Sequence, residues 1–204
     1  MNETEFLIGR DGLDLVDDFY PDDLPSEWRF DYYSNQFRTL CLPIDTQEDL
    51  EEIFEALEES TTEKSDEKFE LVLSISAQLL ANVSTLEVLL DAIKPYKSLF
   101  TLFCELDSPL NTKILPLLKG YQVAFQAQSE VKLKLKLQTR KVAEKYLYYN
   151  HLPVLYTQNS WDEKQIRTYV EQVAVINTRT ILICKNAEKE ALEKIKVIAQ
   201  ILGF

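Results

Sequence analysis

The chain has 204 residues, 46% of them hydrophobic and 27% charged, with a formal net charge of −12. This composition excludes a disordered or collagen-like chain, and no apolar stretch is long enough to form a membrane-spanning helix. The length suits one hydrophobic core, so we expect a single domain over residues 1–204. The acidic balance argues against general nucleic-acid binding, because a phosphate backbone is bound by cationic surface.

The charge is unevenly distributed along the chain. Residues 1–70 carry a net charge of −17, whereas residues 71–204 carry +5. The second region can therefore present a local basic face, although charges that simply coat solvent-exposed surfaces give the same totals.

Cysteine usage indicates a reducing compartment. Cys41, Cys104 and Cys184 lie far apart, each within an apolar run, which predicts buried and reduced thiols. The chain opens with acidic residues rather than a basic and then apolar segment, so no signal peptide is visible. We therefore expect a cytoplasmic protein. The single histidine and the scattered cysteines lack the spacing of a zinc site, and we interpret His151 as a helix C-terminal residue.

Short apolar runs separated by helical segments predict alternating strands and helices. We expect strands at residues 6–9, 38–42, 69–75, 99–106, 121–128, 153–158 and 180–185. Such alternation predicts parallel strands joined by helical crossovers, in a barrel or in an open doubly wound sheet. The strictly alternating residues 129–138 (SEVKLKLKLQ) predict a half-buried strand that forms a hairpin with residues 121–128.

Helical periodicity is clearest in Gln47–Ser60, where apolar residues recur every three or four positions and acidic residues cover the other face. Thr46 is expected to cap this helix. Further helices are predicted to begin at polar residues that can cap an N-terminus: Ser26, Ser84, Ser160 and Asn186. The helix from Ser26 should bury Phe30, Tyr33 and Phe37.

The first strand and the loop after it carry a family resemblance. Gly9 and Gly12 give a G-x-x-G turn, and residues 19–21 read Phe-Tyr-Pro. Further matches follow at Leu24, Tyr32, Tyr33 and Phe37. This segment resembles the opening of the YecE-like family (domain of unknown function seventy-two), and residues 181–202 resemble, more weakly, that family's last strand and helix.

The resemblance implies an α/β protein with a TIM-like (β/α) barrel of about seven strands. One arginine-containing strand of the family has no counterpart here, so we expect the ring to be incomplete or irregular near residues 129–160. Where the family has Glu-x-Asn after its second strand, residues 41–45 read CLPID, and Gln126 and Gln128 stand where an Arg-His pair is expected. The resemblance therefore implies a shortened member that has lost part of its polar site.

Ligands of a barrel gather at the carboxyl ends of its strands, and polar residues cluster there. Asp11, Glu105 and Asp107 are candidate catalytic carboxylates, as general acid and base or as oxygen ligands of magnesium or manganese. Candidate ligand-binding residues are Arg10, Gln126, Gln128, Lys185 and Asn186. Alternatively, these side chains only terminate strands and cap helices. No nucleotide, serine-hydrolase or zinc-protease motif occurs, and the sequence names no cofactor and assigns no resident metal.

A basic segment follows the fifth predicted strand and is succeeded by tyrosines. Its candidate nucleic-acid contacts are Lys132, Lys134, Lys136 and Arg140, because cations and aromatic rings together can hold single-stranded RNA. Lysines on an exposed strand also protect a sheet edge from aggregation, and tyrosines at such spacing more often face a core.

Three hypotheses for function follow. The first is a YecE-like barrel protein, non-catalytic or weakly active, that binds a small anionic ligand or a protein partner. The second is a metal-assisted hydrolase that uses carboxylates at the barrel mouth. The third is an RNA-associated accessory protein. No membrane association is expected, and the sequence predicts neither the ligand nor the oligomeric state.

Overall fold

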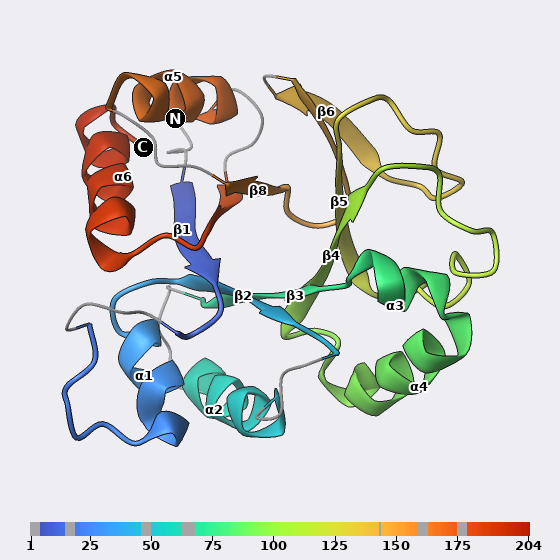
Figure 1. Cartoon of the computed structure of the whole chain (residues 1–204), viewed down its shortest axis with the longest axis horizontal. Coiled ribbons are helices and arrows are strands. Elements are labelled where there is room, and N and C mark those ends of the chain that lie inside the picture. The colour runs from blue at the N-terminus through green and yellow to red at the C-terminus, as the bar shows by residue number, and fades with distance from the viewer. Residues whose placement is uncertain are drawn as a thin grey trace.

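Nine strands form one strongly curled sheet (Figure 1). The computed structural model describes residues 5–14, 19–45, 50–62, 68–142, 144–158, 163–174 and 179–204. The strands are β1 (Glu5–Asp11), β2 (Thr39–Pro43), β3 (Glu70–Ser74), β4 (Phe100–Leu106), β5 (Gln122–Ala127), β6 (Gln138–Val142), β7 (Lys145–Tyr149), β8 (Val154–Gln158) and β9 (Arg179–Lys185). Their order in the sheet is β6-β7-β5-β4-β3-β2-β1-β9-β8.

Helices lie around the outside of the curl (Figure 1). They are α1 (Arg29–Ser34), α2 (Leu50–Thr62), α3 (Ala77–Ala81), α4 (Val83–Ile93), α5 (Glu163–Ala174) and α6 (Lys189–Ile201), with 3-10 turns η1 (Ser26–Trp28) and η2 (Lys94–Tyr96). Their apolar faces join one core cluster with the strands. Phe30, Tyr33 and Phe37 are buried as predicted. No helix in the described part of the chain is long and apolar enough to span a membrane.

The seven strands predicted from apolar runs are present within two residues of their expected bounds. These seven strands are parallel to one another, and their order in the sheet is β5-β4-β3-β2-β1-β9-β8. Continuous runs such as Leu71–Leu73 are fully buried, as expected for parallel strands that are covered on both faces.

The predicted TIM-like barrel is wrong, because the sheet is mixed and does not close into a ring of alternating strands and helices. β7 is antiparallel to β5 and β6 is antiparallel to β7, so β6 and β8 are the two ends of the sheet. No helix forms within residues 107–121, all of which are described. Pro109, Pro116 and Gly120 interrupt this segment, which runs in successive turns. The result is a strand-rich half-barrel with few helices.

The predicted hairpin between residues 129–138 and β5 is also wrong. β6 begins only at Gln138 and pairs with β7 across the short connection from Val142 to Lys145. Even so, Leu133 and Leu135 are half-buried against the core, while the lysines that alternate with them, at positions 132, 134 and 136, are exposed. The alternation therefore predicts which side chains are buried, but β7 takes the place beside β5.

Two helices begin at residues other than those predicted. Asn82, not Ser84, caps α4, because its side-chain oxygen accepts a hydrogen bond from Thr85 N at 3.3 Å. α6 follows Glu188, whereas Asn186 turns the chain with a φ of 53°, a left-handed conformation that asparagine tolerates.

The three cysteines, Cys41, Cys104 and Cys184, are free and buried as predicted. Burial raises the pKa of each thiol to about 12, so all three stay protonated at neutral pH. The interpretation of His151 is wrong, since it lies between β7 and β8 and not at a helix end. Thr46 and Ser160, which were expected to cap helices, lie outside the described residues.

At the amino ends of the parallel strands, two arginines and two glutamates form an ion-pair network. Arg179 Nη1 lies 3.0 Å from a carboxylate oxygen of Glu70, and Arg179 Nε lies 2.9 Å from Glu5. Glu5 also pairs with Arg38 at 2.6 Å. The Glu70 side chain is only 3% exposed, so Arg179 takes the place of the water that would otherwise stabilise its carboxylate. No sequence pattern indicated this network, because its members come from β1, β3, β9 and the residue before β2.

Candidate functional site

Tyr156 lies inside the curl and contacts both halves of the sheet. Its hydroxyl donates to a carboxylate oxygen of Asp11 on β1 at 3.4 Å, and its ring centroid is 5.4 Å from that of Phe103 on β4. Lys185 Nζ lies 5.8 Å from the same ring centroid. Burial and then the charge of Asp11 raise the pKa of Tyr156 well above its usual value, so the phenol stays a hydrogen-bond donor.

Gln126 connects β5 to β8, which share no backbone ladder. Its side-chain oxygen accepts from Tyr156 N at 2.9 Å, and its Nε2 donates to Tyr156 O at 2.8 Å and to Glu105 at 2.9 Å. Lys145 Nζ donates to the same Tyr156 carbonyl at 2.7 Å. An amide side chain can replace a peptide group in this way because it offers one acceptor and two donors. Gln126 therefore holds the curl together and has little capacity left for a ligand.

The three predicted catalytic carboxylates separate into two groups. Asp11 and Glu105 approach Tyr156 from β1 and β4, where both charges raise its pKa. Asp107 lies beyond the end of β4 and is exposed. Asp11 also accepts a hydrogen bond from Asn186 N at 2.6 Å. Among the described residues, no three Asp, Glu, His or Cys side chains are placed to hold a metal ion. The second hypothesis therefore lacks a ligand set in this part of the chain.

Of the predicted ligand-binding residues, Gln126, Lys185 and Asn186 lie around Tyr156 and Asp11, whereas Arg10 and Gln128 lie elsewhere. Gln128 is exposed after β5, and Lys185 is half-buried on the ring of Tyr156. Arg10 precedes Asp11 on β1, and successive side chains of a strand point to opposite faces. Asp11 turns toward Tyr156 inside the curl, whereas Arg10 turns toward the loop and helices outside it. The sequence therefore predicts correctly which edge of the sheet carries these polar residues. It does not predict which face of the sheet each side chain occupies.

Arg10 belongs to a group of cations and aromatic side chains, here called the β1-loop cation cluster: Arg10, Arg29, Lys189, Phe19 and Tyr20. Arg10 is 5% exposed. Its Nε donates to the carbonyl of Asp11 at 2.9 Å, but its buried Nη1 has no hydrogen-bond partner in the part of the chain that the structure describes. No described carboxylate lies within ion-pair distance of Arg10. A buried guanidinium in this state has lost its hydration without full compensation.

The other two cations of the cluster lie over aromatic faces. The Arg29 guanidinium is 5.2 Å from the ring centroid of Tyr20, and Lys189 Nζ is 5.9 Å from that of Phe19. Arg29 Nε is also buried without a hydrogen bond to any described residue, although Arg29 Nη1 lies 3.5 Å from the exposed Asp14. Burial raises the pKa of Tyr20 to about 12, against the opposing charges of Arg29 and Arg10. The cluster is therefore cationic and keeps a neutral phenol at neutral pH.

Tyr33 of α1 fixes the backbone of Arg10. Its hydroxyl accepts from Arg10 N at 3.1 Å and donates to the carbonyl of Thr39 at 3.0 Å, so the phenol is inserted between β1 and β2. Tyr33 is fully buried. Gly9 permits this arrangement, because a Cβ there would lie 2.0 Å from the Thr39 carbonyl oxygen. Sequence reasoning placed Tyr33 in the core but did not predict this bridging role.

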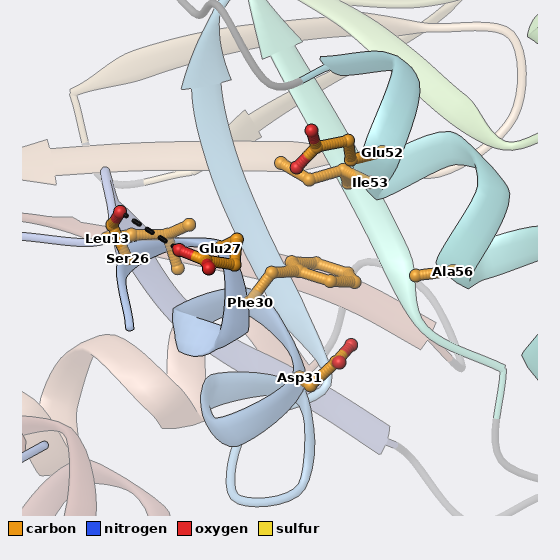
Figure 2. Close-up of a pocket in the computed structure, with 8 residues that line it drawn as sticks. All are labelled: Leu13, Ser26, Glu27, Phe30, Asp31, Glu52, Ile53 and Ala56. Atoms are coloured by element: carbon orange, nitrogen blue, oxygen red, sulfur yellow. Dashed lines mark hydrogen bonds between the residues drawn. The ribbon is translucent and has the colours of Figure 1, made fainter. Parts of the chain in front are cut away.

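A separate pocket lies between η1, α1 and α2 (Figure 2). It encloses about 180 Å³ and is lined by Leu13, Ser26, Glu27, Phe30, Asp31, Glu52, Ile53 and Ala56. Three of these side chains are carboxylates, and Ser26 donates a hydrogen bond to Glu27 at 3.4 Å. None of the residues singled out as a site candidate lines this pocket, and its charge disfavours an anion.

The basic segment after β5 is exposed, but its neighbouring aromatics are not. Lys132, Lys134, Lys136 and Arg140 all face solvent. Tyr148 and Tyr149 are 4% and 1% exposed, so they belong to the core as the alternative interpretation held.

Comparisons with known proteins do not assign the chain to a family. No protein-family model matches the chain, and neither a curated protein nor a solved structure is significantly similar to it.

Proposed function

We propose that this chain binds a small oxyanion, of the class of inorganic phosphate and carboxylates, at the β1-loop cation cluster, without turning it over. The observation that supports the proposal is the buried Nη1 of Arg10, which has no hydrogen-bond partner among the described residues. Buried charges in proteins are normally paired, and breaking a buried pair costs about 3–5 kcal/mol. An anion beside Arg10 would supply the missing partner.

The chemistry of the cluster suits an oxyanion. A guanidinium offers parallel donors that match two oxygens of a phosphate or carboxylate. Arg29 and Lys189 add positive charge to the cluster from their positions over Tyr20 and Phe19. Their carboxylate partners, Asp14 and Glu193, are exposed. Tyr33 fixes the backbone of Arg10, so the donor is held in place before a ligand arrives.

Thermal unfolding in the presence of phosphate tests the proposal. At ten times its dissociation constant, phosphate should stabilise the wild type by roughly 1.4 kcal/mol, which is about 3–6 °C for a chain of this length. Sodium chloride at equal ionic strength should have little effect. Arg10→Met should abolish the phosphate response, whereas Arg167→Met, which removes an exposed arginine of α5, should retain it.

The chain could also satisfy Arg10 with a carboxylate of its own. Asp17 and Asp18 are close to Arg10 in sequence and lie outside the described residues. The double variant Asp17→Asn/Asp18→Asn therefore belongs in the same experiment. Phosphate stabilisation that appears only in this double variant, or equally in Arg10→Met, would contradict ligand binding by the wild type.

We also propose a cytoplasmic location and a distant relationship to the YecE-like family. The location is supported by three buried, unpaired cysteines, which persist best in a reducing compartment. The relationship is supported by motif residues that have definite structural tasks. Gly9 allows the close approach to β2, Gly12 has a φ of 71°, and Phe19 is buried. Both proposals rest on these residues alone.

A further inference from the structure

Exposed cations follow one another along β6 and the segment before it, here called the β6 strip: Lys132, Lys134, Lys136, Arg140 and Lys141. All five side chains are exposed, and no described carboxylate lies within ion-pair distance of any of them. Elsewhere on the described chain, exposed cations such as Arg167 and Lys194 do find carboxylates. In a chain with a net charge of −12, this strip is a local inversion of charge.

The same place offers unused backbone hydrogen-bonding groups. β6 is the end of the sheet and pairs only with β7. Four of its five residues are exposed, and no described residue makes a backbone hydrogen bond to its outer edge. A strand edge of this kind can accept one further strand from another chain.

Two occupants fit the strip poorly. Single-stranded RNA binds largely by base stacking, but Tyr148 and Tyr149 are buried and Lys141 Nζ lies 5.3 Å above the ring of Tyr146. A second copy of this chain paired through β6 would bring Arg140 and Lys141 against their own equivalents, and like charges opposite each other destabilise a strand pair.

We propose that the β6 edge binds an extended, acidic peptide segment of a partner protein, which adds to the sheet as a tenth strand. Backbone hydrogen bonds to β6 give the segment its register, and alternate carboxylates pair with the β6 strip. This site is independent of the anion site at Arg10, which lies on β1 and faces the helices outside the curl.

Peptide binding to the intact wild-type chain tests the proposal. The probe is a fluorescent peptide of about eight residues that alternates glutamate with valine, the length of a typical strand. Its partner probe carries N-methyl groups on alternate residues, which preserve charge but remove backbone donors. Binding is measured by fluorescence anisotropy at low and at physiological salt, with a short oligo(U) RNA as a third probe.

The proposal predicts that N-methylation weakens binding at least about tenfold and that Arg140→Glu/Lys141→Glu has a similar effect on the unmodified peptide. The control variant Lys97→Glu/Lys119→Glu reverses two exposed lysines on distant turns and should bind as the wild type does. Circular dichroism shows whether each variant is folded. Equal binding of both peptides would overturn the proposal, and so would tighter binding of RNA. Aggregation of the charge-reversed variant without any loss of peptide binding would also overturn it, because the lysines would then only protect the edge from aggregation.

Discussion

The arginines at the two ends of β1 differ in whether a carboxylate is paired with them. At the amino end, Arg179 and Arg38 face Glu5 and Glu70 at 2.6–3.0 Å, and the most buried carboxylate lies in direct contact with a guanidinium. At the carboxyl end, Arg10 is more deeply buried than either arginine of the network but has no carboxylate at ion-pair distance among the described residues. Among the described residues, the Arg10 side chain donates a hydrogen bond to the backbone carbonyl of Asp11.

This contrast separates a structural charge network from a candidate binding site. A network whose charges are matched within the chain has no electrostatic need for a ligand. A buried cation held in place by Tyr33, with no described carboxylate at ion-pair distance, retains that need. The two ends therefore predict different responses to mutation and to added anions.

The largest effect is expected at the amino end. Arg179→Met leaves Glu70 buried without its partner, so the free energy of unfolding should fall by roughly 3–5 kcal/mol. Urea denaturation measures this loss. The double variant Arg179→Met/Glu70→Gln should recover part of it, because the uncompensated carboxylate is gone. If the single variant is as stable as the wild type, the network is not a structural element and the contrast fails.

Tyr33→Phe should give the next largest effect, at the carboxyl end. It removes the hydroxyl that bridges Arg10 N and Thr39 O, and leaving such buried groups unpaired costs about 1–3 kcal/mol. It should also weaken phosphate binding, since Arg10 loses its anchor, whereas Tyr32→Phe on the neighbouring position should change neither. Normal phosphate affinity in a destabilised Tyr33→Phe protein would show that α1 does not preorganise the site.

Much of this architecture could be predicted from local sequence. The parallel strands are runs such as Leu71–Leu73 that are buried on both faces, so hydrophobicity alone marks them. The antiparallel β6 and β7 could not be predicted in the same way, because β6 (QTRKV) is mostly polar and β7 (KYLYY) is mostly tyrosine. The barrel interpretation assumed a helical crossover after every strand, but residues 107–121 are too rich in breakers to form one.

The site was only half predictable for a related reason. Arg10 and Asp11 mark the carboxyl end of β1 in the sequence, and both are part of the described polar clusters. Which face each one occupies depends on strand alternation and on partners more than 100 residues away, such as Tyr156. The pairing of Glu70 with Arg179 is equally remote in sequence, so no local pattern could indicate it.

The smallest predicted effect concerns His151, whose pKa is influenced by charges of the amino-end network. Partial burial lowers its pKa below the usual value, opposed by Glu70 and assisted by Lys68 and Arg179. The unfolded chain therefore takes up the proton first as the pH falls below about 6.5, so stability should decline there until the lowered folded-state pKa is reached. His151→Gln should show a smaller decline between pH 7 and 5 in urea denaturation. An unchanged slope would mean that folding does not lower the pKa of His151.

Arginine side-chain NMR during a phosphate titration tests most directly whether Arg10 is an unfilled anion site. The account predicts that the Nε–H resonance of Arg10, assigned by its loss in Arg10→Met, shifts in a saturable way. The resonances of Arg179 in its matched network and of exposed Arg167 should stay in place at the same ionic strength. An Arg10 resonance that does not move while phosphate is added, or one that moves no more than that of Arg167, would contradict the account.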